Sequence, residues 1–354
     1  MALKEHTTTF FDCTRQAPPV SAAARNFQDI KSTSISGFTF DERMQYLLQY
    51  GCHCMSYSAL QPGMQYFDMP GVGYIPYMRK WGARFALADP VCHERDRERL
   101  ITAFIEDHPN CGFVQVSEAV AEIINRTHGF YTTQFGIESI VNLDTWSIGG
   151  KKRQVLRTAV NHSKKRGITV VERYDETRDR QLTSRWLKTR KVKHKEIIFL
   201  IRPMGMDYHV GTRKFYAYDG EELLGFIYFD PVYRDNQLIG YVPNISRFDE
   251  SFKQGIFYTI MVHAMEIFKK EGVRELHLGL CPLATNGADK PSESSIVKLV
   301  IRLLYNHANK IYNFKGIYFT KSRFGGEESK TFCCHKSMMP LLKFLTLFRI
   351  ANVL

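Results

Sequence analysis

Seven lysines and arginines, and no carboxylate, lie in one short stretch, GGKKRQVLRTAVNHSKKRG, which runs from Gly149 to Gly167. Apolar residues recur within it at helical spacing, so we expect an amphipathic helix. On a helical wheel of about 100° per residue, Arg153, Arg157 and Lys164 fall within about 40° of one another. Arginine binds phosphate in a bidentate manner, and no carboxylate competes here. With Lys152 beside this stripe, the stretch predicts a phosphate-binding surface; a plain solvated helix face is the alternative.

The whole chain is basic and has enough apolar residues for a large core. Its 354 residues are 44% hydrophobic and 13% aromatic, and carry a formal charge of +12 with a pI of about 9.2. Length and composition allow two globular domains of ordinary size. The charge is typical of a protein with a polyanionic partner, either nucleic acid or an anionic lipid surface; a soluble protein that is merely basic is the equal alternative.

Cysteine usage and hydropathy indicate a cytoplasmic protein. Eight cysteines are spread over the chain, unlike the dense pattern of a small secreted domain. The N-terminus lacks the apolar core of a signal peptide, and no run of about eighteen apolar residues occurs. The clusters CHC at 52–54 and CCH at 333–335 lack the C-x-x-C spacing of structural zinc sites, so no metal is expected. Cys281, at the end of a strand, is expected to be a buried thiol.

The pattern of apolar residues predicts an α/β fold of the α+β kind, with two similar lobes. Residues 1–36 are rich in Thr, Ser, Ala and Pro and are expected to form an N-terminal arm. Each of the segments 37–170 and 171–354 then shows helices between strands, so we expect two related lobes. Asp219-Gly220 predicts a hairpin turn.

Five local expectations concern single helices, strands or caps. Asp41 is expected to cap the first helix, and Gly129 to end the helix AVAEIINRTHGF. VRELHLGLCPL predicts one buried strand, and NKIYNFKGIYFTKSRF predicts two more strands. The C-terminal MMPLLKFLTLFRIANVL predicts a terminal helix or strand docked on the core, with an amphipathic membrane anchor as the alternative.

Several segments, in order and spacing, carry a resemblance to a known family. They are QYFDMPGVGYIPY, LADPVC, FGIESIVNL, GKK-x-x-x-LR-x-AVN, LLGFIYFDPVYRDN, LHLGLCPLA and YNFKGIYFTKSRF, within residues 40–330. Together they resemble the DUF2156 family, the cytosolic catalytic part of bacterial phosphatidylglycerol lysyl- and alanyltransferases. In that family two acetyltransferase-like (GNAT) lobes lie in tandem. The resemblance implies a mixed, mostly antiparallel sheet flanked by helices in each lobe, and it assigns the catalytic role to the second lobe.

The resemblance implies transfer of an aminoacyl group from aminoacyl-tRNA to an amine or hydroxyl, with aminoacyl-tRNA as co-substrate and no cofactor. GNAT relatives that use acetyl-CoA have a glycine-rich turn before the long helix, and RFDESFKQG has only Gly255 there. No P-loop and no dinucleotide-binding loop occurs either. An acyl-CoA-dependent N-acyltransferase is one alternative. A non-catalytic protein that binds RNA or an anionic membrane is another.

The resemblance also supplies four candidate catalytic residues. The Lys-x-Lys/Arg pair that follows YNF-x-G in the family, where it helps hold the aminoacyl-tRNA end, corresponds to Lys321 and Arg323. Either cation could neutralise the terminal phosphate or the oxyanion of the tetrahedral intermediate. The family's acidic and basic residues before the long helix correspond to Asp249 and Arg247, in reversed order. Asp249 is the candidate for holding an ammonium group.

The resemblance does not identify the acceptor substrate, and it leaves open whether the protein contacts the inner membrane. A lipid headgroup and a small molecule both stay open as acceptors. Peripheral contact with the inner membrane through the C-terminus would favour the lipid. His263 and His277 lie beyond the candidate catalytic residues, and buried histidines with satisfied hydrogen bonds are expected there rather than bases.

Overall fold

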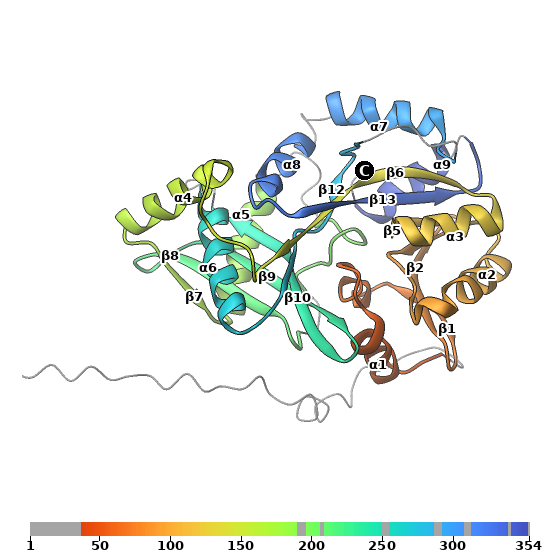
Figure 1. The fold of residues 1–354 in the computed structure, drawn as a ribbon, viewed down its shortest axis with the longest axis horizontal. Helices are drawn as coiled ribbons and strands as arrows, with labels where there is room; N and C mark the ends of the chain where they lie inside the picture. The colour runs from red at the N-terminus through yellow and green to blue at the C-terminus, as the bar shows by residue number, and fades with distance from the viewer. Residues whose placement is uncertain are drawn as a thin grey trace, which may run out of the picture. The chain divides into compact units, whose positions relative to one another are not determined.

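One mixed sheet runs through the part of the chain that the structure describes. The computed structural model describes residues 37–189, 196–205, 209–249, 255–286, 292–307, 313–338 and 341–352, so the predicted arm at 1–36 lies outside the described residues. Ser36–Leu354 is a single compact unit. Figure 1 shows its strands and the helices that cover them.

The elements of the first half follow the expected alternation of strands and helices. In chain order they are α1 Phe40–Tyr50, a 3-10 turn Ser58–Leu60, β1 Gln65–Met69, β2 Gly73–Lys80, β3 Ala83–Leu87, β4 Val91–Cys92, a 3-10 turn Glu94–Asp96, α2 Arg97–Asp107, β5 Cys111–Ser117, α3 Glu118–His128, β6 Tyr131–Asn142, a 3-10 turn Lys151–Arg153 and α4 Gln154–Lys165. Gly129 ends α3 in the left-handed conformation, which confirms that prediction.

The second half contains the remaining elements. They are β7 Thr169–Glu172, α5 Glu176–Lys188, β8 Arg213–Asp219, β9 Glu222–Arg234, β10 Gln237–Phe248, α6 Ile256–Lys270, β11 Glu275–His277, β12 Cys281–Pro282, α7 Ser295–His307, α8 Phe314–Ser322, β13 Glu327–His335 and α9 Leu341–Ile350. β8 and β9 form the predicted hairpin, in which Asp219 pairs with Glu222.

The strand order shows that the end of the chain returns to the first half. The order is β1-β2-β3-β5-β13-β6-β11-β10-β9-β8-β7, with β4 on β2 and β12 on β6. Among the strand pairs of the described residues, only β3–β5 and β10–β11 are parallel. β13 lies between β5 and β6, although more than 180 residues separate it from β6 along the chain. The lobe boundary at residue 170 stays a prediction, and the pairing adds β13 to the sheet of the first lobe.

Helix α6 forms the centre of the largest apolar cluster. Its buried residues include Ile260, Ala264 and Phe268, which pack with apolar residues of β8, β9 and β10. Helix α4 covers the N-terminal half of α6: Leu156 belongs to the same cluster, and the hydroxyl oxygens of Ser163 and Thr259 are 2.8 Å apart. Figure 1 shows the two helices side by side. The predicted basic stretch is therefore an amphipathic helix with a buried flank.

Three local predictions differ from the structure. Thr39, rather than Asp41, caps α1, because its hydroxyl accepts the Glu42 N–H and the Glu42 carboxylate accepts the Thr39 N–H. The segment predicted as one buried strand is two short strands, β11 and β12, with Gly279 at φ 69° between them. The expected strand that contains Lys321 is the helix α8, whose N-cap Asn313 accepts the Gly316 N–H at 2.9 Å. Local capping explains the first and third differences.

Replacing Asp230 with Asn tests a fully buried ion pair in the second half. The Asp230 carboxylate accepts hydrogen bonds from Arg202 Nε at 2.7 Å and Nη2 at 2.6 Å, and both side chains are 0% exposed. We expect D230N to lower the free energy of unfolding by about 3–5 kcal/mol in urea titrations, because an uncompensated guanidinium stays buried. E98Q, which breaks the exposed pair with Arg126, should change it by no more than about 1 kcal/mol. Equal losses in both variants would contradict this account.

Candidate functional site

The basic stretch splits into two groups of cations with different surroundings. Lys152 and Lys164 are exposed, whereas Arg153 and Arg157 are partly buried. Arg157 Nη1 donates to the carbonyl oxygens of Ile148 at 2.8 Å and Gly150 at 2.6 Å. The predicted stripe is therefore only partly available to a ligand. Arg157 holds the chain before α4, and Lys164 lies about 16 Å further along the helix axis than Arg153.

Arg153 lies against the residues that follow Arg323. Its Nε donates to the Phe324 carbonyl at 3.4 Å, and its guanidinium faces the Trp146 ring at 5.7 Å from the ring centre. A Cβ atom placed on Gly325, whose φ is 71°, would lie 3.0 Å from Arg153 Nη2. The structure thus brings the start of the basic stretch to the end of α8, where the second predicted group of cations lies.

Lys321 and Arg323 point to different neighbours at the end of α8. Lys321 Nζ donates to the Leu280 carbonyl at 2.9 Å and lies 3.7 Å from the position of a Cβ on Gly279. Burial lowers the pKa of Lys321, and the nearby Cys281, Cys54 and Glu138 oppose that shift. The Arg323 guanidinium lies 3.7 Å from the centre of the Phe319 ring. Within the described residues, its buried Nε has no hydrogen-bond acceptor.

Arg247 and Asp249 lie at the other end of the candidate site, beside α5. Arg247 is buried, stacks on the Trp186 ring at 4.0 Å and donates to Glu196 at 2.7 Å. The Asp249 carboxylate forms an ion pair with Arg185 at 3.5 Å. Arg247 is therefore held in place by other side chains, whereas the cation that faces Asp249 is on an exposed arginine.

A row of aromatic rings connects these two groups. Phe248, between Arg247 and Asp249 in β10, packs edge-on against Phe257 in α6, with ring centres 6.0 Å apart. Phe257 packs in the same way on Phe324, at 6.2 Å. The residues predicted at the two ends of the site are thus connected by rings from β10, α6 and the segment after α8.

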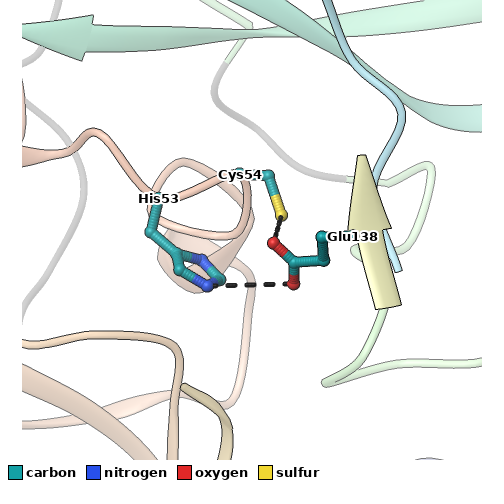
Figure 2. A group of neighbouring side chains, drawn as sticks. All are labelled: His53, Cys54 and Glu138. Carbon is teal, nitrogen blue, oxygen red and sulfur yellow. Dashed lines mark hydrogen bonds and ion pairs between the residues drawn. The ribbon is translucent and has the colours of Figure 1, made fainter. Parts of the chain in front are cut away.

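Four polar side chains near Lys321 were not predicted as a site. Glu138 in β6 accepts hydrogen bonds from Gln115 Nε2 at 2.8 Å and from Cys54 Sγ at 3.4 Å. His53 Nε2 lies 3.8 Å from the Glu138 carboxylate. Figure 2 shows His53 and Cys54, from the loop after α1, pointing toward Glu138. The CHC cluster therefore meets a carboxylate of β6, a partner that residue spacing alone could not indicate.

The other candidate nucleophiles and bases are occupied or neutral. Burial raises the pKa of Cys281 and of Cys54, in the second case well above the ordinary thiol value. His277 is buried, and its Nε2 lies 2.8 Å from Glu275. Burial lowers the pKa of His263, which packs edge-on near Phe215. Cys281 and His277 thus fit the structural roles that the sequence favoured for them.

Comparison with protein families and curated proteins identifies related sequences. A family model described as "Phosphatidylglycerol lysyltransferase, C-terminal" matches residues 44–335. A phosphatidylglycerol lysyltransferase of Staphylococcus epidermidis is 21% identical over 274 residues, which are 73% of this chain and 31% of that protein. The chain spans 31% to 38% of the length of the first curated relatives that it matches.

Solved structures share the fold. The structure of L-PGS from Bacillus licheniformis has a TM-score of 0.75 at 20% identity and covers 89% of this chain and 97% of that chain. The C-terminal DUF2156 domain of a putative lysylphosphatidylglycerol synthetase from Agrobacterium fabrum has a TM-score of 0.72 at 17% identity, over 88% of this chain and 97% of that chain. The fold is thus two tandem GNAT-like lobes, as the sequence predicted.

The two kinds of cation in the basic stretch should differ in their effect on stability. We expect R157A to lower the free energy of unfolding by about 1–2 kcal/mol, because two carbonyl acceptors lose a charged donor. K164A removes an exposed cation and should change it by less than about 0.5 kcal/mol. Urea titrations monitored by circular dichroism measure both. Equal stability of R157A and the wild type would show that Arg157 does not hold the loop before α4.

Proposed function

Because the chain belongs to the family of phosphatidylglycerol lysyltransferase C-terminal domains, we propose that it transfers an aminoacyl group from aminoacyl-tRNA to an acceptor. The acceptor in this proposal is a hydroxyl of a lipid headgroup, with a small-molecule hydroxyl or amine as the alternative. The acceptor oxygen attacks the ester carbonyl, and the bond to the terminal ribose oxygen of the tRNA breaks. The ribose oxygen then takes up a proton, while the acceptor hydroxyl loses one.

The observation that carries this proposal is the contact of Arg153 with Phe324 and Gly325. It places the start of the basic stretch next to Lys321 and Arg323, so cations from two distant segments can face one RNA end. Lys151 and Lys152 are exposed at this end of the basic stretch, and Lys164 and Lys165 are exposed at the other end of α4. Uncompensated cations at this density favour the phosphates of a tRNA acceptor arm.

Lys321 is the proposed donor to the oxyanion that forms during transfer. Its ammonium group has three N–H donors, and one of them is used by the Leu280 carbonyl. Because the side chain is partly buried, a charge that develops nearby is poorly screened by water. An aminoacyl ester is already activated, so positioning and oxyanion stabilisation are the main requirements of this reaction.

Asp249 and Arg247 receive different roles in this proposal. The Asp249 carboxylate already faces a cation, Arg185, and we assign it to the ammonium group of the aminoacyl donor or of the acceptor. Arg247 is stacked on Trp186 and bound by Glu196, so we assign it a positioning role for the end of β10. Direct contact of Arg247 with a substrate is not required.

The packing at the start of α6 supports an ester donor over acyl-CoA. A Cβ atom placed on Gly255 would lie 3.2 Å from the Ala159 Cβ, so α4 covers the backbone at which α6 begins. A glycine-rich turn before this helix is what acetyl-CoA-using relatives provide for the pyrophosphate. Occupation of the space beside Gly255 by α4 therefore argues against that donor.

Exposed leucines on two helices support a lipid acceptor. Leu299 and Leu303 of α7 are 59% and 51% exposed, and Leu342 of α9 is 81% exposed. Within the described residues, no helix has the length and apolar character needed to cross a bilayer. We propose that α7 and α9 touch the membrane surface peripherally, which would bring the headgroup to an enzyme that takes its donor from the cytoplasm.

Replacing Lys321 with Met should abolish most of the transfer while keeping the side-chain volume. The assay mixes the protein with radiolabelled aminoacyl-tRNAs and phosphatidylglycerol vesicles, and measures label in lipid and label lost from tRNA. We expect K321M to lower kcat/KM by about 100- to 1000-fold, the usual effect of removing an oxyanion donor. K315M, which removes an exposed lysine from the same helix, is the matched control and should retain activity.

Three results would count against the proposal. If the wild-type protein discharges no aminoacyl-tRNA but consumes acetyl-CoA, the acyl-CoA alternative is correct. Binding of tRNA without discharge, even with a cell extract as the source of acceptors, would favour a non-catalytic RNA-binding protein. Equal kcat/KM of K321M and K315M would show that Lys321 is not the oxyanion donor.

A further inference from the structure

We propose that His53, Cys54 and Glu138 bind one divalent transition metal ion of the zinc type. These three residues, the metal triad below, come from the loop after α1 and from strand β6. The proposal concerns a site that the transfer reaction does not require, so it stands independently of the proposed function.

The spacing of the three side chains suits a tetrahedral metal ion. Their ligand atoms all lie within 4.8 Å of one another, with Cys54 Sγ 3.4 Å from Glu138 Oε2 and His53 Nε2 3.8 Å from Glu138 Oε1. With bonds of about 2.3 Å to sulfur and about 2.0 Å to nitrogen or oxygen, the edges of a zinc tetrahedron are about 3.3–3.5 Å. The separation between His53 and Glu138 is too long for a hydrogen bond and needs only a small closure around an ion.

The metal triad is also well shielded from water. The Cys54 residue is 3% exposed, and the His53 and Glu138 side chains are 9% and 14% exposed. Thiolate, imidazole and carboxylate are all ligands that zinc accepts. Three protein ligands leave a fourth position for water or another small ligand, which is the arrangement of open zinc sites.

The surroundings of Gln115 are a second, independent indication that the metal triad is a ligand site. It is 0% exposed, and its Nε2 lies 2.8 Å from Glu138 Oε1 and 3.7 Å from Cys54 Sγ, so its amide borders two members of the metal triad. Its buried Oε1 has no hydrogen-bond partner among the described residues. Gln115 also has a φ of 58° at a bulge in the β5–β13 pairing. Bulges and left-handed non-glycine residues concentrate at functional sites, where they aim a side chain.

The charges of the ligands match those of a bound divalent ion, and binding changes the protonation of two of the three side chains. Two negative ligands, the Cys54 thiolate and the Glu138 carboxylate, balance the two charges of the metal, so the filled site is neutral. Because Cys54 is a neutral thiol without metal, binding adds one net positive charge beside Lys321, the two charges of the ion less the proton that is released. Binding releases the thiol proton to solvent as the metal–sulfur bond forms. His53 Nδ1 accepts the Met55 N–H at 3.1 Å in the metal-free state, so the ring proton on Nε2 moves to Nδ1 on binding and that hydrogen bond is lost.

Cys52 supplies a matched control from the same CHC cluster. It lies two residues before Cys54 and is partly exposed, and it is not a member of the metal triad. Replacing Cys52 with Ser therefore makes the same chemical change in the same loop without removing a ligand. Glu138→Gln is nearly isosteric and keeps an oxygen for the Cys54 thiol.

The test is metal titration of the full chain after treatment with a chelator. Zn²⁺ binding is measured by calorimetry, and Co²⁺ binding by the sulfur-to-cobalt charge-transfer absorption that a thiolate ligand produces. We expect one ion per chain for the wild type and for C52S. Affinity for Zn²⁺ should fall by at least about 100-fold in E138Q and in C54S, because loss of a direct metal ligand should weaken binding at least as much as loss of a residue that hydrogen-bonds to a ligand. C54S should also lose the charge-transfer band.

Circular dichroism in the presence of chelator checks that each variant is folded. If C54S does not fold, E138Q and H53Q decide the question, since both keep the buried thiol. The proposal is overturned if the wild type binds less than one Zn²⁺ per chain at micromolar concentration. It is equally overturned if folded E138Q and H53Q bind Zn²⁺ as tightly as C52S does.

Discussion

The pairing of β6 on both of its edges is the constraint on which the rest of the structure depends. β13 pairs with one edge from Tyr131 to Ile140, and β11 and β12 pair with the other. Three strands from the last quarter of the chain therefore pair with one strand of its first half. Glu138 lies in this strand, and the loop with His53 and Cys54 and the end of α8 with Lys321 come close to it. The polar cluster around Glu138 forms at this place because strands pair with both edges of β6.

Helix α4 serves both the fold and the proposed binding surface. Its apolar flank covers α6, and Arg157 binds the backbone before it, so part of its positive charge has a structural use. Arg153 connects this helix to Phe324 and to the end of α8. For the exposed Lys151, Lys152, Lys164 and Lys165, the structure shows no such backbone hydrogen bond within the residues that it describes. A basic stretch that looks uniform in sequence therefore contains residues with two separate roles, and only the structure distinguishes them.

Local signals in the sequence predicted much of the fold, and failed where two local preferences compete. The hairpin at Asp219 and the end of α3 at Gly129 follow from turn and cap chemistry, and both predictions are confirmed. Helix α8 was predicted as strand because Ile, Tyr and Phe dominate its sequence; the cap at Asn313 is the signal that could have corrected this. Glu138 could not be predicted as a site residue, since its partners Gln115, Cys54 and His53 come from distant segments.

The central claim is that the aminoacyl end of tRNA binds between the start of α4 and the end of α8. A crystal structure with a stable amide analogue of a 3′-aminoacyl-adenosine carrying a short acceptor stem tests it most directly. The account predicts the analogue's carbonyl oxygen within hydrogen-bond distance of Lys321 Nζ, with stem phosphates beside Arg153 and the exposed lysines of the basic stretch. An analogue bound elsewhere, with Lys321 still directed only at the Leu280 carbonyl, would contradict it.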